Sequence, residues 1–170
     1  MLGELNYTYD ILVFPRHLKA VKKFIAALPP MRLVIDHIAK PKIGEQEIEE
    51  WAQDMFDIAQ NQHVYCKLSG MVTETNPGWK EGDFQPYMDV IFELFGEDRV
   101  MFGSDWPVCL LNGDYKKVYD IAYNFTTKWS KTATDKVFSK NALSFYKNRD
   151  GAEEEEMPKL PSLIKFFSKK

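Results

Sequence analysis

The sequence predicts an α/β fold built on a parallel sheet, and three observations support this prediction. Four apolar runs of strand length recur along the chain, and stretches with helical spacing of apolar residues lie between them. Most of the runs are nearly continuous in Val, Ile, Leu and Phe, which is typical of strands that are covered on both faces. A strand–helix alternation repeated about four times indicates βα units, and therefore parallel strands.

The predicted strands are short, and the last three of them carry polar residues at their downstream ends. Each is bounded by a turn signal or by the start of a helical pattern, so each has the length of a single strand. They are YDILVF (9–14), RLVIDH (32–37), VYCKLSG (64–70) and RVMFGSD (99–105).

Amphipathic helices are predicted between these strands. In 17–28 the apolar residues fall on one helical face, and 45–61 repeats this pattern with Glu and Asp on the opposite side. The stretch 86–96 opens with Pro86, which suits a first helical turn, and closes with Gly96, which suits a C-cap. These three helices complete the βα units.

Two further helices are predicted after the fourth strand. Val118, Ala122, Phe125 and Trp129 form the apolar stripe of the first, and Thr134 or Asp135 is suited to cap the second. A chain of 170 residues is long enough for one domain with a hydrophobic core. A closed (β/α)₈ (TIM) barrel typically takes about 250 residues, so the count leaves open roughly half a barrel or a self-contained doubly wound sheet.

Composition excludes several classes of partner. The formal net charge is -3 and no basic stripe occurs, which argues against a nucleic-acid partner. No run of about 18 apolar residues predicts a membrane span, and the first residues lack the pattern of a signal peptide. Cys66 and Cys109 lie in or beside apolar stretches, which favours reduced core thiols and a cytoplasmic protein.

The last part of the chain changes character. Residues 149–170 carry an acidic run, two prolines and a short basic and apolar end. This composition predicts a solvated, disordered tail. The alternative is that LPSLIKFF docks on a surface as a short helix. The domain is therefore predicted to occupy residues 1–148.

Polar residues gather at the downstream ends of the predicted strands, where parallel sheets and barrels bind ligands. His37 could be a metal ligand, an acid or base, or a hydrogen-bond donor to a carbonyl; alternatively it is a core histidine paired with Asp36. Asp105 could hold a metal or take a proton from water; alternatively it is a helix N-cap ahead of Pro107. The strand context favours a functional role for Asp105.

Other polar and aromatic residues near the same edge are weaker candidates. Lys40 and Lys67 could fix a substrate carboxylate, although lysines at strand ends more often reach solvent. Ser69 is predicted mainly to form the turn out of its strand. Trp106 could wall a pocket or only pack, and the loop 73–84 is the connector best suited to touch a substrate.

Metal and nucleotide motifs are missing from the sequence. There is no GxGxxG, GxxxxGK[ST], GxSxG or CxxC pattern, and the three histidines form no HxH or HExxH pair. A catalytic zinc takes about three protein ligands. Because only His37 and Asp105 are good candidates, the metal site predicted from this sequence is incomplete.

Three segments of the sequence, in this order, resemble motifs of the amidohydrolase-related (amidohydrolase 2) family. They are LVIDHIAKP, VYCKLSG and DRVMFGSDWPVCLL, and NALSFY follows near the end. Within that family the sequence is most similar to the branch of sugar-acid lactonases such as L-fuconolactonase and L-rhamnonolactonase. The resemblance covers residues from about 2 to 147. It implies a (β/α)₈ barrel of which this chain supplies strands five to eight.

The resemblance also implies an activity and its residues. The expected reaction is hydrolysis of a lactone, with His37 after the sixth strand polarising the carbonyl or touching a metal. Asp105, after the eighth strand, would be the base that activates water. Many members use a divalent metal such as zinc or manganese, whereas the pyronedicarboxylate branch works without one.

The sequence departs from the family in one respect that matters. The family opens with an HxH motif on its first strand, and no such motif occurs here. Two hypotheses follow for the chain as given. The first is a lactone hydrolase by ancestry, and the second is an inactive, truncated half-barrel that associates with another chain through exposed sheet edges.

Overall fold

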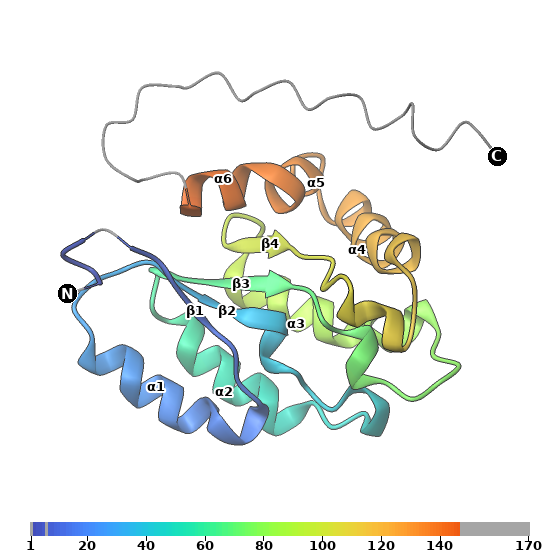
Figure 1. Ribbon diagram of the computed structural model, residues 1–170, viewed down its shortest axis with the longest axis horizontal. Helices are drawn as coiled ribbons and strands as arrows, with labels where there is room; N and C mark the ends of the chain where they lie inside the picture. Colours follow the sequence, from blue (N-terminus) through green and yellow to red (C-terminus); the bar gives the residue numbers. More distant parts are fainter. Residues whose placement is uncertain (1, 6, 147–170) are drawn as a thin grey trace.

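The sheet contains four parallel strands in the order of the chain, which confirms the predicted α/β class. The computed structural model describes residues 2–5 and 7–146. The strands are β1 (Tyr9–Ile11), β2 (Leu33–Ile35), β3 (Val64–Leu68) and β4 (Val100–Phe102), each hydrogen-bonded to the next (Figure 1). They are shorter than predicted, because β2, β3 and β4 end before the last polar residues of their runs and β1 ends at Ile11.

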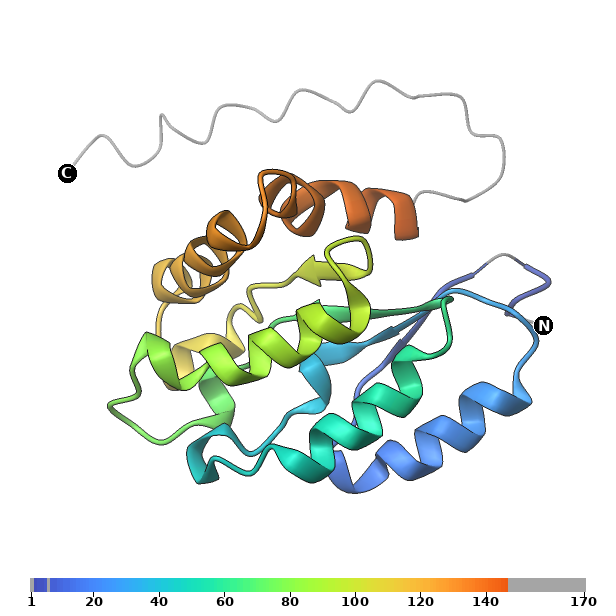
Figure 2. The ribbon, with the colours of Figure 1, turned by 180° about the vertical axis from the view of Figure 1, so that it is seen from behind.

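Three helices cover one face of this sheet. They are α1 (Leu18–Ala27), α2 (Glu49–Ala59) and α3 (Gln85–Phe95), close to the predicted ranges, and Figures 1 and 2 show them on the same side. Alternate strand residues point into this layer, so that the buried set in β3 is Val64, Cys66 and Leu68. The helical periodicity therefore identified the face that forms the larger core.

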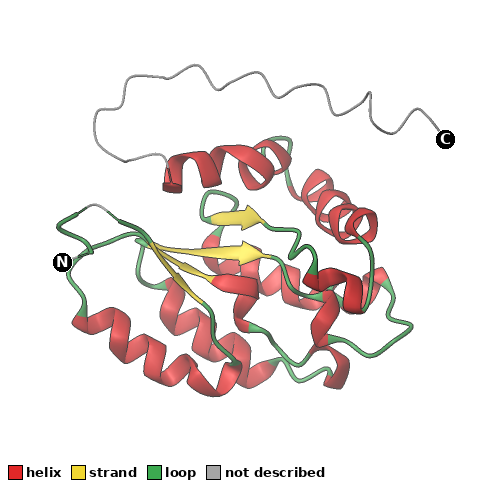
Figure 3. Ribbon diagram, viewed as in Figure 1, coloured by secondary structure: helices red, strands yellow, loops and turns green. Residues whose placement is uncertain are grey.

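The chain after β4 is mostly helical. It comprises α4 (Tyr115–Trp129), α5 (Ala133–Asp135), a π-helical segment (Lys136–Lys140) and α6 (Asn141–Tyr146), as Figure 3 shows by colour. Helix α4 packs on α3, with the rings of Phe92 and Phe125 4.8 Å apart. Asp114 caps α4 by accepting a hydrogen bond from the Lys117 amide at 2.8 Å.

Helix α6 lies over the opposite face of the sheet. Phe145 is 1% exposed and forms a second, smaller core with Val34 and Met101. Its ring centroid lies 4.9 Å from that of Tyr65. Arg32 donates to the Phe145 carbonyl at 2.5 Å. The second face is therefore covered as well, in agreement with the apolar strands, but the sequence did not predict that α6 is the helix that covers it.

The edge of the sheet at β4 is also covered, which differs from the expectation of two exposed edges. The Asn141 amide donates to the carbonyls of Glu97 at 2.7 Å and Val100 at 2.6 Å. The π-helical segment and α6 pack against β4. Of the two edge strands, β1 is the one along which exposed apolar side chains such as Tyr9 and Leu12 gather.

Two of the composition-based predictions concern the described residues directly. Cys66 and Cys109 are free and buried, and burial raises the pKa of both thiols. Within residues 2–5 and 7–146, no helix has the length and apolar character needed to cross a membrane. The predicted tail, 149–170, lies outside the described residues.

Candidate active site

The turn that follows β2 places His37. Residues 36–39 leave the strand as a tight turn, and four consecutive residues from His37 to Lys40 have φ between 45° and 59°. Left-handed backbone of this kind costs roughly 1–2 kcal/mol for each residue other than glycine. The Trp51 indole donates to the Ile38 carbonyl at 2.8 Å, which helps to hold the turn. Such strain is typical of functional sites.

His37 contacts a residue from each of the next two strands. Its Nδ1 lies 2.7 Å from the Ser69 hydroxyl, just after β3. Its Nε2 lies 3.5 Å from Asp105 Oδ1, just after β4. The alternative that His37 pairs with Asp36 is wrong. The geometry thus brings together the two residues that sequence reasoning ranked highest, and adds Ser69, which it had assigned to a turn.

The backbone conformation holds Asp105 at the same carboxyl-terminal edge of the sheet. Its φ is 54°, and its carbonyl accepts a hydrogen bond from the Cys109 amide at 2.8 Å. The side chain is 9% exposed, and Oδ2 is buried with no hydrogen-bond partner among the described residues. The helix N-cap alternative is wrong, because the Asp105 carboxylate caps no described helix and Asp114 caps α4.

Lys67 lies on the face of the sheet that α6 covers, within a cluster of carboxylates. Its Nζ is 2.6 Å from Asp10 Oδ2 and 3.2 Å from Asp36 Oδ1. Burial lowers the pKa of Lys67, but the hydrogen bond to Asp10 and the charge of Asp36 outweigh burial and raise it above its ordinary value. Tyr146 donates to Asp10 Oδ2 at 2.9 Å, and burial together with that bond raises the pKa of Tyr146 to about 12.

Lys40 and Trp106 differ from each other in exposure. Lys40 Nζ forms a largely buried ion pair with Glu74 at 2.7 Å. Trp106 is 64% exposed, so most of its side chain faces solvent. Both lysines predicted to bind substrate are therefore matched by carboxylates of this chain. Sequence reasoning did not identify Asp10 or Glu74 as partners, because each lies more than 30 positions from its lysine.

The site fits a divalent metal in part. Asp105 Oδ2 is a buried carboxylate oxygen without a partner, and a carboxylate oxygen beside an imidazole nitrogen is a donor set that zinc or manganese accepts. His37 and Asp105 would be two of the ligands. Among residues 2–5 and 7–146, no group of three or more His, Cys, Asp or Glu side chains is arranged to hold a metal.

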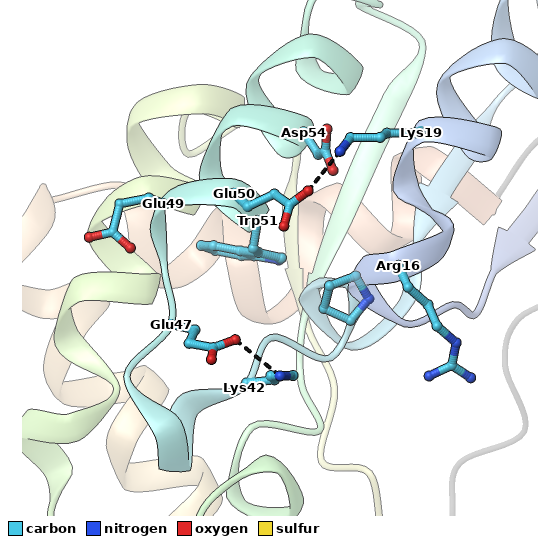
Figure 4. Close-up of a pocket in the computed structure, with 9 residues that line it drawn as sticks. Arg16, Lys19, Lys42, Glu47, Glu49, Glu50, Trp51 and Asp54 are labelled. Atoms are coloured by element: carbon cyan, nitrogen blue, oxygen red, sulfur yellow. Dashed lines mark hydrogen bonds and ion pairs between the residues drawn. The ribbon is translucent and has the colours of Figure 1, made fainter.

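A separate pocket lies between the starts of α1 and α2. It has a volume of about 640 Å³, and its walls carry charged residues of both signs around Trp51 (Figure 4). Lys19 pairs with Glu50 at 2.6 Å, and Lys42 pairs with Glu47 at 3.0 Å. None of the predicted site residues lines this pocket, so it is distinct from the site at His37 and Asp105.

Comparison with known proteins supports the resemblance seen in the sequence. The amidohydrolase family model matches residues 1–147. The chain is 36% identical over 151 residues to L-fucono-1,5-lactonase of Burkholderia ambifaria, covering 84% of this chain and 50% of that protein. It is 39% identical over 125 residues to L-fucono-1,5-lactonase of Burkholderia multivorans, covering 66% of this chain and 42% of that protein.

A solved structure shows the same relationship. The crystal structure of an amidohydrolase from Burkholderia multivorans with bound zinc superposes with a TM-score of 0.81 at 34% identity, covering 86% of this chain and 54% of that one. The chain thus spans about half the length of the relatives it matches. Since the family model covers most of the chain and the fold agrees, the chain belongs to the amidohydrolase family.

Proposed function

We propose that this chain carries the water-activating and carbonyl-polarising groups of a hydrolase that opens a sugar-acid lactone. The observation that carries the proposal is the approach of His37 Nε2 to Asp105 Oδ1 at 3.5 Å, at the carboxyl-terminal edge of a parallel sheet. That edge is where catalytic groups of parallel barrels project. The similarity to two L-fucono-1,5-lactonases supports a lactone as the substrate class.

The two side chains have complementary roles in this proposal. Asp105 Oδ2 takes a proton from water as the water oxygen attacks the lactone carbonyl. The bond between the carbonyl carbon and the ring oxygen then breaks, and the proton passes from Asp105 to the ring oxygen to give the open hydroxy acid. Removing the proton needs a base with a free oxygen, and Oδ2 has no hydrogen-bond partner among the described residues. His37, whose Nε2 lies 3.5 Å from Asp105 Oδ1, donates a hydrogen bond to the carbonyl oxygen and so polarises it.

A divalent cation is part of the proposal for the complete enzyme. The zinc-bound amidohydrolase with a similar fold supports this, and His37 and Asp105 would contribute two ligands. When bound, zinc or manganese supplies a Lewis acid that polarises a carbonyl and lowers the pKa of water. Zinc and manganese are both candidates for this cation.

The substrate contacts proposed from the sequence are Lys40, Lys67 and Trp106. The two lysines would meet a ligand as ion pairs, with Glu74 and with the aspartates around Lys67. A paired ammonium and carboxylate offer hydrogen-bond donors and acceptors together. Such a pair is better suited to bind the hydroxyl groups of a sugar lactone than to bind a carboxylate of the substrate. Exposed Trp106 would provide an apolar surface beside Asp105.

We also propose that β1 to β4 correspond to strands five to eight of an eight-stranded barrel. Four parallel strands in chain order, with helices α1 to α3 on one face, are what half of such a barrel contains. The coverage of about half of each relative agrees with this count. Activity would then require the complementary half.

The experiment that tests the function is a chimera. Residues 1–147 replace the aligned segment of the B. ambifaria lactonase, and hydrolysis of L-fucono-1,5-lactone and other aldonolactones is measured. We expect hydrolysis, and we expect Asp105→Asn to lower kcat/KM by about 10²- to 10⁴-fold, as for loss of a general base. Asp135→Asn, at an exposed position on α5, is the matched control and should leave kcat/KM unchanged.

The 170-residue chain by itself is the second arm of this experiment. A catalytic zinc takes about three protein ligands and the described site offers two, so we expect no turnover above background with added zinc or manganese. A folded chimera that opens no lactone would contradict the proposed function. Turnover by the chain alone, lost in Asp105→Asn, would contradict the half-barrel proposal.

The second candidate function is a non-catalytic half-barrel that acts by association. The observation that favours it is the edge at β1, where exposed apolar side chains include Tyr9 and Leu12. A pocket of about 350 Å³ adjoins that strand and is lined by Leu2, Gly3, Tyr9, Phe24, Leu28, Pro29 and Met31. An open strand edge beside apolar surface is suited to pairing with another chain.

A further inference from the structure

The buried hydroxyl of Ser69 has a single hydrogen-bond partner, and that partner is the proposed catalytic histidine. Ser69 is 2% exposed, and its Oγ lies 2.7 Å from His37 Nδ1. No other hydrogen bond of this side chain is present in residues 2–5 and 7–146. The proton of the Ser69 hydroxyl therefore has one acceptor available to it, and leaving a buried donor unpaired costs about 1–3 kcal/mol.

The other ring nitrogen gives an independent indication of the proton's position. Neutral imidazole has one protonated nitrogen and one lone pair. If Nδ1 carried the proton, the lone pair of Nε2 would face Asp105 Oδ1 at 3.5 Å, and two acceptors would oppose each other. If Ser69 donates to Nδ1, the Nε2 proton faces that carboxylate instead. Both ends of the ring favour the same tautomer.

Two glycines shape the space in which this pair sits. A Cβ at Gly70 would lie 2.7 Å from His37 Cβ and Cγ, and the φ of Gly70 is 65°, so a side chain is excluded there. A Cβ at Gly103 would lie 3.0 Å from Ser69 Cβ and 3.3 Å from its Oγ. The hydroxyl and the ring are therefore confined from both sides, and the hydrogen bond is part of a closely packed arrangement.

We propose that, in the metal-free chain, Ser69 is a positioning residue that holds neutral His37 as the Nε2–H tautomer. His37 then presents a hydrogen-bond donor towards the space beside Asp105, as polarisation of a carbonyl oxygen requires. A metal ligand would need the Nε2 lone pair, and hence reversal of the Ser69 hydrogen bond. The role of this tautomer in catalysis rests on the proposed function, but the presence of the tautomer in the folded chain does not.

The test is ¹⁵N NMR of the complete chain with labelled histidine, without metal, at about pH 8, above the ordinary imidazole pKa of ~6.5. Long-range proton–nitrogen correlations identify which ring nitrogen is protonated, and the His37→Gln variant assigns the His37 signals among the three histidines. We expect protonated Nε2 and unprotonated Nδ1. The opposite tautomer would overturn the proposal, and the unmodified chain is sufficient to decide this.

Variants test the part played by Ser69. In Ser69→Ala the Nδ1 resonance of His37 should move, since it loses its donor, while the signals of His17 and His63 stay in place. Ser144→Ala, which removes an exposed hydroxyl from α6, should leave all three histidines unchanged. An unmoved Nδ1 resonance in folded Ser69→Ala would overturn the assignment. Because no turnover is measured, failure of the lactone chimera and failure of this inference are separate outcomes.

Discussion

Single residues fix how the loops around the sheet are joined, and Arg99 is the clearest case. It precedes β4, and its guanidinium donates to four backbone carbonyls at 3.0–3.3 Å, those of Ala59, Asn61, Val64 and Leu94. Burial lowers the pKa of Arg99 from its ordinary value. One side chain thus ties the end of α2, the start of β3 and the end of α3 to β4.

Arg99→Met is expected to destabilise the chain by about 3 kcal/mol. The substitution keeps the apolar stem but leaves the carbonyls of Ala59, Val64 and Leu94 without the donor they have now, and hydrogen bonds to charged groups are each worth roughly 1.5–3 kcal/mol. Urea unfolding measures the change. Lys128→Met, at an exposed position on α4, should change stability by less than about 0.5 kcal/mol. Equal effects of the two variants would contradict the role of Arg99.

At the scale of elements, α6 decides whether the second face of the sheet is covered. Phe145 is 1% exposed, while Leu143 on the same helix is 49% exposed. Phe145→Ala should cost about 3–5 kcal/mol in urea unfolding, because it leaves a cavity against Val34 and Met101. Leu143→Ala is the matched control and should cost less than about 0.5 kcal/mol. Similar costs for both would show that α6 does not pack on the sheet as described.

Glu97 lies just before β4 and bonds to residues around α5. This contact makes the free energy of unfolding depend on pH. Hydrogen bonds from Lys136, Ser130 and Thr132 lower the pKa of Glu97 to about 2, from an ordinary value of 4.5. The unfolded chain therefore binds more protons between these values. The stabilisation is complete above about pH 4.5 and is lost as the pH falls towards 2.

Urea unfolding across this pH range checks the Glu97 prediction. Glu97→Gln should remove part of the fall in stability between pH 4.5 and 2, because the neutral amide does not titrate. Glu93→Gln, an exposed position on α3, should leave the slope as it is in the unmodified chain. An unchanged slope in Glu97→Gln would contradict the low pKa in the folded state.

At the scale of the whole molecule, the sheet has unequal edges, and association is expected at β1. Asn141 and the helical region after α4 cover β4, whereas Leu12 and Tyr9 are exposed beside β1. We expect the chain to associate with rising concentration in sedimentation velocity, and Leu12→Lys to weaken this, since a lysine at a strand edge opposes pairing. Leu110→Lys, at a similarly exposed apolar position after β4, is the control. A monomer at every concentration, or equal effects of the two lysines, would contradict it.

The sequence by itself determined the four parallel strands, the helices between them, and the placement of His37 and Asp105 at one edge of the sheet. These follow from local periodicity and from the rule that parallel strands end at one edge, so neighbouring residues carry the information. Asp105 was identifiable because a carboxylate at the end of a core strand stands out against its apolar neighbours.

The tertiary structure alone decided the partners that lie far away along the chain. Tyr146 reaches Asp10 across 136 positions, Lys67 reaches the same carboxylate across 57, and Ser69 meets His37 across 32. Periodicity predicts whether a side chain is buried or exposed. It does not predict which distant group the side chain faces, because the partner depends on how whole elements pack. The packing of α6 on the second face and the contact between Ser69 and His37 are therefore properties of the folded chain.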